Sequence, residues 1–176
     1  MARLMIPTRE NAPDDSKPML DMVRQTMGFV PRVVMLLSMS PAVLKAFLGT
    51  QSALSATLDV KTRHAVALAV SQANDCSYCK ALHSFVSTSV GKNDPEEAAL
   101  NLQGSSFNPK TAVAANFAKR LTEMRGKVKD DDLDAVRKAG FSEAQIVEIV
   151  AFSSQVLMTN FMNNVACTEI DVPAAA

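Results

Sequence analysis

The sequence predicts an all-α fold, and helix start signals are the first observation behind this prediction. Capping residues stand directly before prolines at Ser40, Asp94 and Asn108, which is typical of a helix N-terminus. Between such starts the apolar residues recur with helical spacing, as they do from 111 to 124. No stretch alternates apolar and polar residues between hairpin turns, as strands would require.

The expected helices follow from these signals in chain order. Asp94 with Glu97 and Ser142 with Gln145 have the spacing of capping boxes. Gly91, Gly104 and Gly140 stand where helices are expected to end. The sequence predicts helices near 17–27, 31–37, 41–56, 60–73, 76–90, 95–103, 109–125, 130–139 and 142–166.

We expect a single domain over 1–176, with 1–16 and 172–176 as loose or arm-like ends. No repeat or long linker divides the chain. The last predicted helix, 142–166, carries apolar residues on more than one face. This pattern indicates burial within the fold or against another subunit.

The composition excludes several classes of function. The 18 basic residues equal the 18 acidic residues, which argues against a nucleic-acid-binding surface. No apolar run approaches the roughly 18 residues of a membrane span, and the first seven residues lack the apolar region of a signal peptide. We therefore expect a cytoplasmic protein without membrane contacts. Three cysteines are too few for a disulfide scaffold, and a close pair in a reducing compartment indicates catalysis or metal binding.

The chemistry is concentrated between His64 and His83. Asn74 and Asp75 are poor helix-interior residues, so one helix should end there and another begin. Cys76 and Cys79 would then lie in the first turn of the new helix, where free N–H groups and the helix dipole favour a thiolate. His83 shares their helical face and can move a proton near neutral pH.

Other interpretations of this cysteine pair stay open at the level of sequence. The two cysteines could be small buried apolar residues. They could also form half of a zinc site, completed by Cys167 or His64. Covalent haem is not expected, because Lys80, not histidine, follows the second cysteine. No glycine-rich phosphate loop is present, so we expect no organic cofactor. We also expect no bound metal, because a redox pair is favoured over half of a zinc site.

The segment from Val66 to His83 resembles the alkylhydroperoxidase D-like (AhpD-like) proteins of the carboxymuconolactone decarboxylase superfamily. Its core, Cys76-Ser-Tyr-Cys79-x-x-x-His83, follows an apolar helix and a small polar turn, as in that family. A second zone, from Ala112 to Thr122 and from Ala139 to Glu148, is similar to the peroxidase-related branch. Together these zones cover most of the chain from about residue 55 onward.

The resemblance implies an AhpD-like multi-helix bundle that assembles as a trimer or hexamer. It also implies that Cys79 is the peroxidatic residue, that Cys76 resolves the sulfenic acid to a disulfide, and that His83 belongs to a proton relay. The dipole argument alone would instead favour Cys76, nearest the helix start, as the more acidic thiol.

His64 stands where the family has its relay glutamate, twelve residues before Cys76. An imidazole can accept and return a proton, whereas a cationic histidine would favour a thiolate directly. His64 could equally be a helix residue without a role. Tyr78 could shape the substrate entrance or fill a gap. We expect Lys80 to be a solvated surface lysine, and Cys167 to be buried or incidental.

The leading functional hypothesis is an antioxidant thiol-dependent peroxidase or disulfide oxidoreductase of the peroxiredoxin type. Its substrate would be a hydroperoxide or a disulfide, and a thiol donor would restore the dithiol. The alternatives are a carboxymuconolactone decarboxylase-type enzyme and a zinc-stabilised or non-enzymatic helical oligomer.

Overall fold

A computed structural model describes residues 3–173, and every regular element in this range is helical. The expectation of an all-α fold is therefore confirmed. The α-helices are α1 (Lys17–Met27), α2 (Arg32–Leu37), α3 (Pro41–Ser55), α4 (Val60–Ala73), α5 (Ser77–Phe85), α6 (Pro95–Leu102), α7 (Pro109–Glu123), α8 (Asp130–Lys138) and α9 (Glu143–Ala166). A short 3-10 helix, η1 (Asp14–Ser16), precedes α1, and a π-helical turn, η2 (Val86–Val90), follows α5.

The capping signals position most helix starts as the sequence predicts. The side chains of Ser40 and Asn108 accept backbone N–H groups at the starts of α3 and α7, and Ser142 forms a reciprocal capping box with Gln145. The predicted capping box of Asp94 and Glu97 is wrong. Asp94 caps α6, but the carboxylate of Glu97 accepts hydrogen bonds from the loop that connects α6 to α7.

The helix predicted over 76–90 is interrupted. Regular α-helix ends at Phe85, and the chain continues through η2, where the N–H of Gly91 bonds the carbonyl of Val86. Valine, serine and threonine are weak helix formers, which favours a break here. Gly91 is required by close approach, because a Cβ there would lie 2.7 Å from the Ser87 carbonyl oxygen and 3.1 Å from Nε2 of His64.

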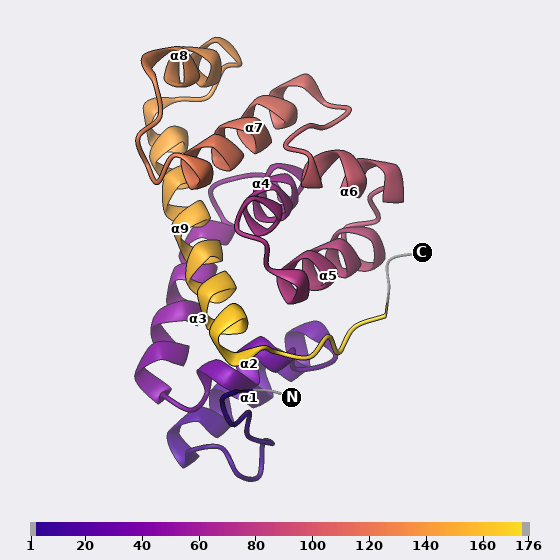
Figure 1. Cartoon of the computed structure of the whole chain (residues 1–176). Coiled ribbons are helices and arrows are strands. Elements are labelled where there is room, and N and C mark those ends of the chain that lie inside the picture. Colours follow the sequence, from indigo (N-terminus) through magenta and orange to yellow (C-terminus); the bar gives the residue numbers. More distant parts are fainter. Residues whose placement is uncertain (1–2, 174–176) are drawn as a thin grey trace.

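Helix α4 lies at the centre of the molecule and packs against α5, α6, α7 and α9. Figure 1 shows α9 running along the molecule, with α7 and α8 at one end and α1, α2 and α3 toward the other. One apolar cluster joins α4, α7 and α9, and a second joins α1, α2 and α3 to α5. The two cysteines of α5 belong to the second cluster.

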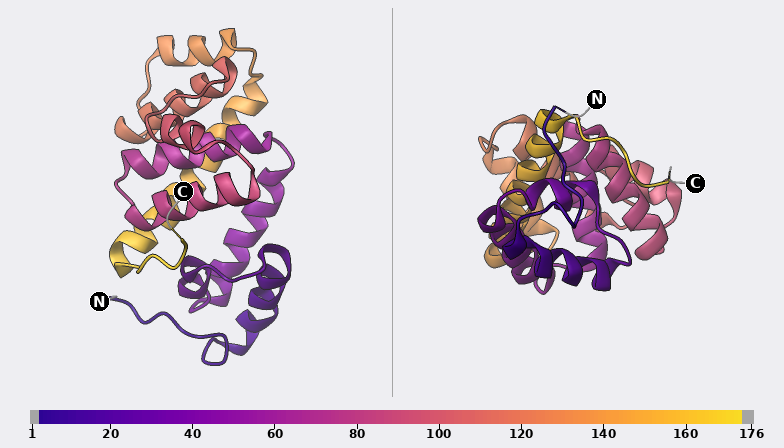
Figure 2. Two further views of the ribbon diagram at one scale, coloured as in Figure 1. Left: turned by 90° about the vertical axis from the view of Figure 1, so that its right-hand side faces the viewer. Right: turned by 90° about the horizontal axis from the view of Figure 1, so that it is seen from below.

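Both ends of the described chain lie near the end of the molecule that contains α1 and α2 (Figure 2). The N–H of Arg3 bonds the carbonyl of Ala166, and Ala12 and Val172 are buried. Asp171 accepts the N–H of Arg32, which fastens the C-terminal segment to α2. Of the loose or arm-like ends predicted at 1–16 and 172–176, residues 1–2 and 174–176 lie outside the described residues. Within 3–173, no helix is long and apolar enough to cross a membrane.

Candidate active site

The turn between α4 and α5 brings the cysteine pair to a helix N-terminus. Asn74 ends α4, and Asp75 adopts a positive φ of 47°, a conformation that Asp tolerates better than most residues. Cys76 is the N-cap of α5, and its sulfur accepts the backbone N–H of Cys79 at 3.2 Å. Cys76 thus lies one residue before the first turn in which the sequence placed it, while Cys79 lies within that turn.

Cys76 and Cys79 are joined by a disulfide bond, with their Cα atoms 5.3 Å apart. Both are buried: Cys76 is 0% exposed and Cys79 is 2% exposed. The two sulfurs nevertheless differ in their surroundings, because Cys79 lines a cavity and Cys76 does not. A reagent in the cavity therefore meets Cys79 first.

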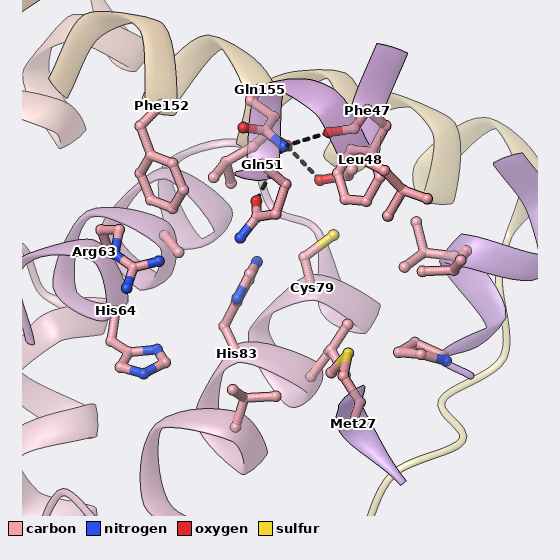
Figure 3. Close-up of a pocket in the computed structure, with 18 of the residues that line it drawn as sticks. Met27, Phe47, Leu48, Gln51, Arg63, His64, Cys79, His83, Phe152 and Gln155 are labelled. Atoms are coloured by element: carbon pink, nitrogen blue, oxygen red, sulfur yellow. Dashed lines mark hydrogen bonds between the residues drawn. The ribbon is translucent and has the colours of Figure 1, made fainter. Parts of the chain in front are cut away.

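The cavity has a volume of about 330 Å³ and is walled by single faces of several helices (Figure 3). Spacings of three and four residues place each set on one helical face. α4 contributes Val60, Arg63, His64 and Ala67, and α5 with η2 contributes Cys79, Leu82, His83 and Val86. Phe47, Leu48 and Gln51 come from α3, and Phe152, Gln155, Val156, Thr159 and Asn163 come from α9.

The remaining wall comes from α1, α2 and the residue before it, and it is apolar. Val60 and Met27 line the cavity and are 49% and 39% exposed, so the cavity opens to solvent near these side chains. The result is an apolar chamber with Cys79 inside and a small number of polar side chains on its walls.

His64 and His83, both singled out from the sequence, face this cavity (Figure 3). Burial lowers the pKa of His64 below its ordinary value, and the nearby Arg63 lowers it further. Burial, with a smaller contribution from His64, lowers the pKa of His83 to about 4. Both rings are therefore neutral at neutral pH. A neutral imidazole can accept or donate a proton, whereas a permanently cationic ring could only stabilise negative charge.

The lowered pKa of His83 predicts an acid-sensitive fold. The ring titrates near 6.5 when unfolded and near 4 when folded, so the unfolded state binds more protons between these values. The free energy of unfolding should therefore fall by roughly 2–3 kcal/mol as the pH drops through this window. This is less than the full difference in pKa would give, because the ring is partly exposed and solvent screens part of the effect.

Urea unfolding of wild type and His83→Asn between pH 7 and pH 4 measures this contribution. The difference between the two curves should shrink as the pH falls, because carboxylates titrate in both proteins. Parallel curves would contradict the assigned pKa of His83.

Asn163 on α9 contacts the sulfur of Cys79, a contact that the sequence did not reveal. Its side-chain N–H groups donate to the sulfur of Cys79 at 3.3 Å and to the carbonyl of Thr159 at 2.9 Å. A backbone carbonyl can only accept, so the Thr159 contact fixes the amide with its nitrogen toward the sulfur. The neighbouring amides of Asn160 and Asn164 donate to the Ser71 hydroxyl and to the Asn74 carbonyl.

The other residues singled out from the sequence lie away from the cavity. The buried hydroxyl of Tyr78 accepts the N–H of Val33, so this side chain fills a gap and does not shape the entrance. Lys80 pairs with Asp75. Cys167 is exposed, so of the two expectations for it, buried or incidental, the first is wrong. Within 3–173, no group of three or more His, Cys, Asp or Glu side chains is arranged to hold a metal, and Cys76 and Cys79 bond each other.

The fold and the site define a class: an all-helical protein with a Cys-x-x-Cys-x-x-x-His centre at the wall of an apolar cavity. Residues 41–120 match the model of the carboxymuconolactone decarboxylase family. This match and a solved AhpD-like structure that is 25% identical support the assignment of the chain to the carboxymuconolactone decarboxylase superfamily. No functionally curated protein shows a significant match.

Solved structures support this fold over nearly the whole chain. The AhpD core of an uncharacterized peroxidase-related protein from Ralstonia eutropha JMP134 is 25% identical, with a TM-score of 0.85 and coverage of 97% of this chain and 92% of that chain. A peroxidase-related protein from Silicibacter sp. TM1040 is 20% identical, with a TM-score of 0.85 and coverage of 99% and 94%. The debrominase Bmp8, as a cysteine-to-alanine variant bound to 2,3,4-tribromopyrrole, is 20% identical, with a TM-score of 0.82 and coverage of 98% and 95%.

Proposed function

We propose that this protein is a thiol-dependent peroxidase that reduces hydroperoxides or disulfides with the Cys76–Cys79 pair. One observation carries the proposal: of two bonded cysteines, Cys79 lines a cavity large enough for a small organic molecule, and Cys76 lies behind it. This arrangement supports two different roles: the Cys79 sulfur reacts with the substrate, and the Cys76 sulfur reacts only with Cys79.

Cys79 is the attacking residue in this proposal. Once reduced, its thiolate would be stabilised by the N-terminus of α5 and by the amide N–H of Asn163. The dipole argument that favoured Cys76 does not decide the order, because a nucleophile must first reach its substrate. Cys76 has the N-cap position but does not line the cavity.

The reaction proceeds in balanced steps. The Cys79 thiolate attacks the terminal oxygen of the hydroperoxide, the O–O bond breaks, and a sulfenic acid and an alkoxide form. The alkoxide takes a proton and leaves as an alcohol. The Cys76 sulfur then attacks the sulfenic sulfur, a disulfide forms, and the hydroxyl leaves with the Cys76 proton as water. Two electrons and two protons from a thiol donor restore the dithiol.

The two neutral histidines suit the proton steps. A new thiolate at Cys79 places negative charge beside His83 and raises the pKa of the imidazole above its value next to the disulfide. His83 can therefore take the thiol proton as the anion forms and pass it to the alkoxide. His64, on the neighbouring wall, would exchange protons with His83 in place of the family's glutamate.

The donor should be a small thiol or a thin thiol-bearing arm, because the disulfide is reached through the cavity and a flat protein surface cannot touch it. We place the reaction in the cytoplasm, where such thiols are kept reduced, and assign it an antioxidant role. Consumption of tert-butyl hydroperoxide with dithiothreitol as donor tests the function directly. The proposal fails if purified reduced protein consumes no organic hydroperoxide above the rate of dithiothreitol alone.

Replacing Asn163 with leucine is expected to make Cys79 less acidic. The amide N–H donates a hydrogen bond that stabilises the charged sulfur. Without this bond the thiolate fraction of Cys79 falls, so alkylation of the reduced thiol near pH 6 should slow by about tenfold. The pH profile of iodoacetamide alkylation is measured in a Cys76→Ser, Cys167→Ser background. Asn164→Leu, which removes a neighbouring asparagine without sulfur contact, should leave the profile unchanged; equal shifts in both variants would contradict the assignment.

A carboxymuconolactone decarboxylase-type reaction is the second candidate, favoured by the family model that residues 41–120 match. It would not need the thiols. Decarboxylation of carboxymuconolactone that survives in both Cys79→Ser and Cys76→Ser would support it. The same dithiol could also reduce a bromopyrrole, replacing bromine with hydrogen as the disulfide forms and bromide leaves; thiol-dependent bromide release would reveal that activity.

We further propose that the protein assembles with copies of itself. Near the C-terminal end of α9 and beyond it, Phe161, Val165 and Ile170 are each more than half exposed. Exposed apolar residues gathered in one region favour a subunit interface. Light scattering of the eluted protein should report a trimer or hexamer, and a monomer would exclude this proposal.

A further inference from the structure

Arg63 is the one charged side chain that lines the cavity of Cys79 within the described chain. We propose that the cavity takes substrates with an apolar body and a carboxylate, and that Arg63 holds the carboxylate. This inference rests on the proposed function of Cys79 and adds the substrate class: organic acids that carry the reducible group.

The guanidinium of Arg63 is fixed and has free donors. Its Nε donates to the carbonyl of Leu58 at 3.1 Å, which leaves the four N–H bonds of the terminal nitrogens for another partner. Figure 3 shows this group turned toward the cavity beside His64. The planar pair of terminal nitrogens matches the two oxygens of a carboxylate.

The protein itself supplies no carboxylate to Arg63 within residues 3–173. Arg9, Arg32, Arg120 and Arg137 each pair with an acidic side chain, but Arg63 forms no such pair. The closest acid in sequence, Asp59, uses one oxygen on the N–H of Thr62 and the other on the Thr62 hydroxyl. A partly buried guanidinium without a counter-ion favours binding of an anion.

The rest of the cavity suits the same ligand. No Asp or Glu lines it, so an entering anion meets no like charge. His64 and His83 are neutral there at neutral pH, and most other lining residues are apolar and would cover the body of the ligand.

The positions of Arg63 and Cys79 orient such a ligand. Arg63 lies one turn from Val60, which is 49% exposed and stands at the opening of the cavity. Cys79 is 2% exposed and lies inside. A carboxylate held near the opening would direct the reactive part of the molecule inward to the sulfur.

Binding of unreactive probes tests this assignment without any turnover. Calorimetry compares decanoate with 1-decanol, which share the same chain, on oxidised wild type, Arg63→Gln, Arg63→Lys and Lys61→Gln. Lys61 is an exposed cation on the same helix that does not line the cavity, so its variant controls for general charge.

Wild type and Lys61→Gln should bind decanoate about tenfold or more tightly than 1-decanol, as for a hydrogen-bonded charge pair. Arg63→Gln should lose this preference but keep its affinity for 1-decanol, which shows that the cavity is intact, and Arg63→Lys should keep part of the preference. The proposal is overturned if wild type does not prefer decanoate, if Arg63→Gln keeps the preference, or if Lys61→Gln loses it equally.

A kinetic comparison then joins the inference to the reaction. For wild type, kcat/KM should be about tenfold higher for a fatty acid hydroperoxide than for its methyl ester, and equal for the two in Arg63→Gln. Decanoate binding without any peroxide reduction would leave the anion site standing and reject the proposed function. Peroxide reduction with no preference for the acid would support the proposed function and reject the anion site.

Discussion

Replacing Cys79 with serine is expected to abolish hydroperoxide reduction, lowering kcat/KM by on the order of 10³-fold or more, as for loss of an essential nucleophile. A serine hydroxyl is not ionised at neutral pH and cannot take the oxygen of a hydroperoxide as a sulfenic acid. Because Cys79 is the cysteine of the pair that lines the cavity, Cys76 cannot take its place. Steady-state consumption of tert-butyl hydroperoxide with dithiothreitol measures the loss.

The Cys76→Ser variant should fail in a different way. It should consume about one equivalent of hydroperoxide and stop at a Cys79 sulfenic acid, because no second sulfur lies beside it to close the disulfide. Dimedone labelling detects that acid. Cys167→Ser, which removes an exposed cysteine outside the cavity, is the matched control and should retain full turnover. Full activity in Cys79→Ser would overturn the assignment of the nucleophile.

The second large effect is expected for His83→Asn. Asparagine keeps a polar side chain of similar length but cannot accept and return a proton, and general acid–base catalysis contributes roughly 10²–10⁴-fold. We expect kcat/KM to fall within this range, with most of the loss recovered at alkaline pH, where the thiolate forms without a base. The pH dependence of kcat/KM from pH 5 to pH 10 separates this effect from damage to the fold.

His64→Asn serves as the comparison for His83. His64 lies close to Gly91 on the neighbouring wall and would exchange protons only through His83, so we expect a smaller loss, about tenfold, consistent with a supporting role in the relay. A larger loss in His64→Asn than in His83→Asn would reverse the order of the two histidines. Unchanged activity in both variants would remove the relay from the mechanism.

The helices could be predicted because their signals are local. A capping side chain such as Asn108 bonds residues two and three positions along the chain, so the sequence contains the whole interaction. Glu97 was misread for the opposite reason: its hydrogen-bond partners, Ser106 and Phe107, belong to the next loop. The π-helical turn after Phe85 was also missed, since weak helix formers there indicate a break but do not specify its geometry.

In the candidate site, too, the features that depend on local spacing could be predicted, and those that depend on contacts between distant segments could not. The spacing of Cys76, Cys79 and His83 places them on one helix, and a short spacing of this kind can be read from the sequence. The cavity cannot, because its walls come from segments as distant as α1 and α9. The contact of Asn163 with Cys79 spans 84 residues, and the neutrality of the two histidines depends on burial, which only the packed fold supplies.

A single-turnover titration tests the central claim most directly. Fully reduced protein is mixed with one equivalent of tert-butyl hydroperoxide, and free thiols and disulfides are assigned by peptide mass spectrometry. We predict loss of two thiols per hydroperoxide, formation of a Cys76–Cys79 disulfide, and an unmodified Cys167. A protein that keeps all three thiols, or one in which Cys79 is oxidised to an acid while Cys76 stays free, would contradict the account.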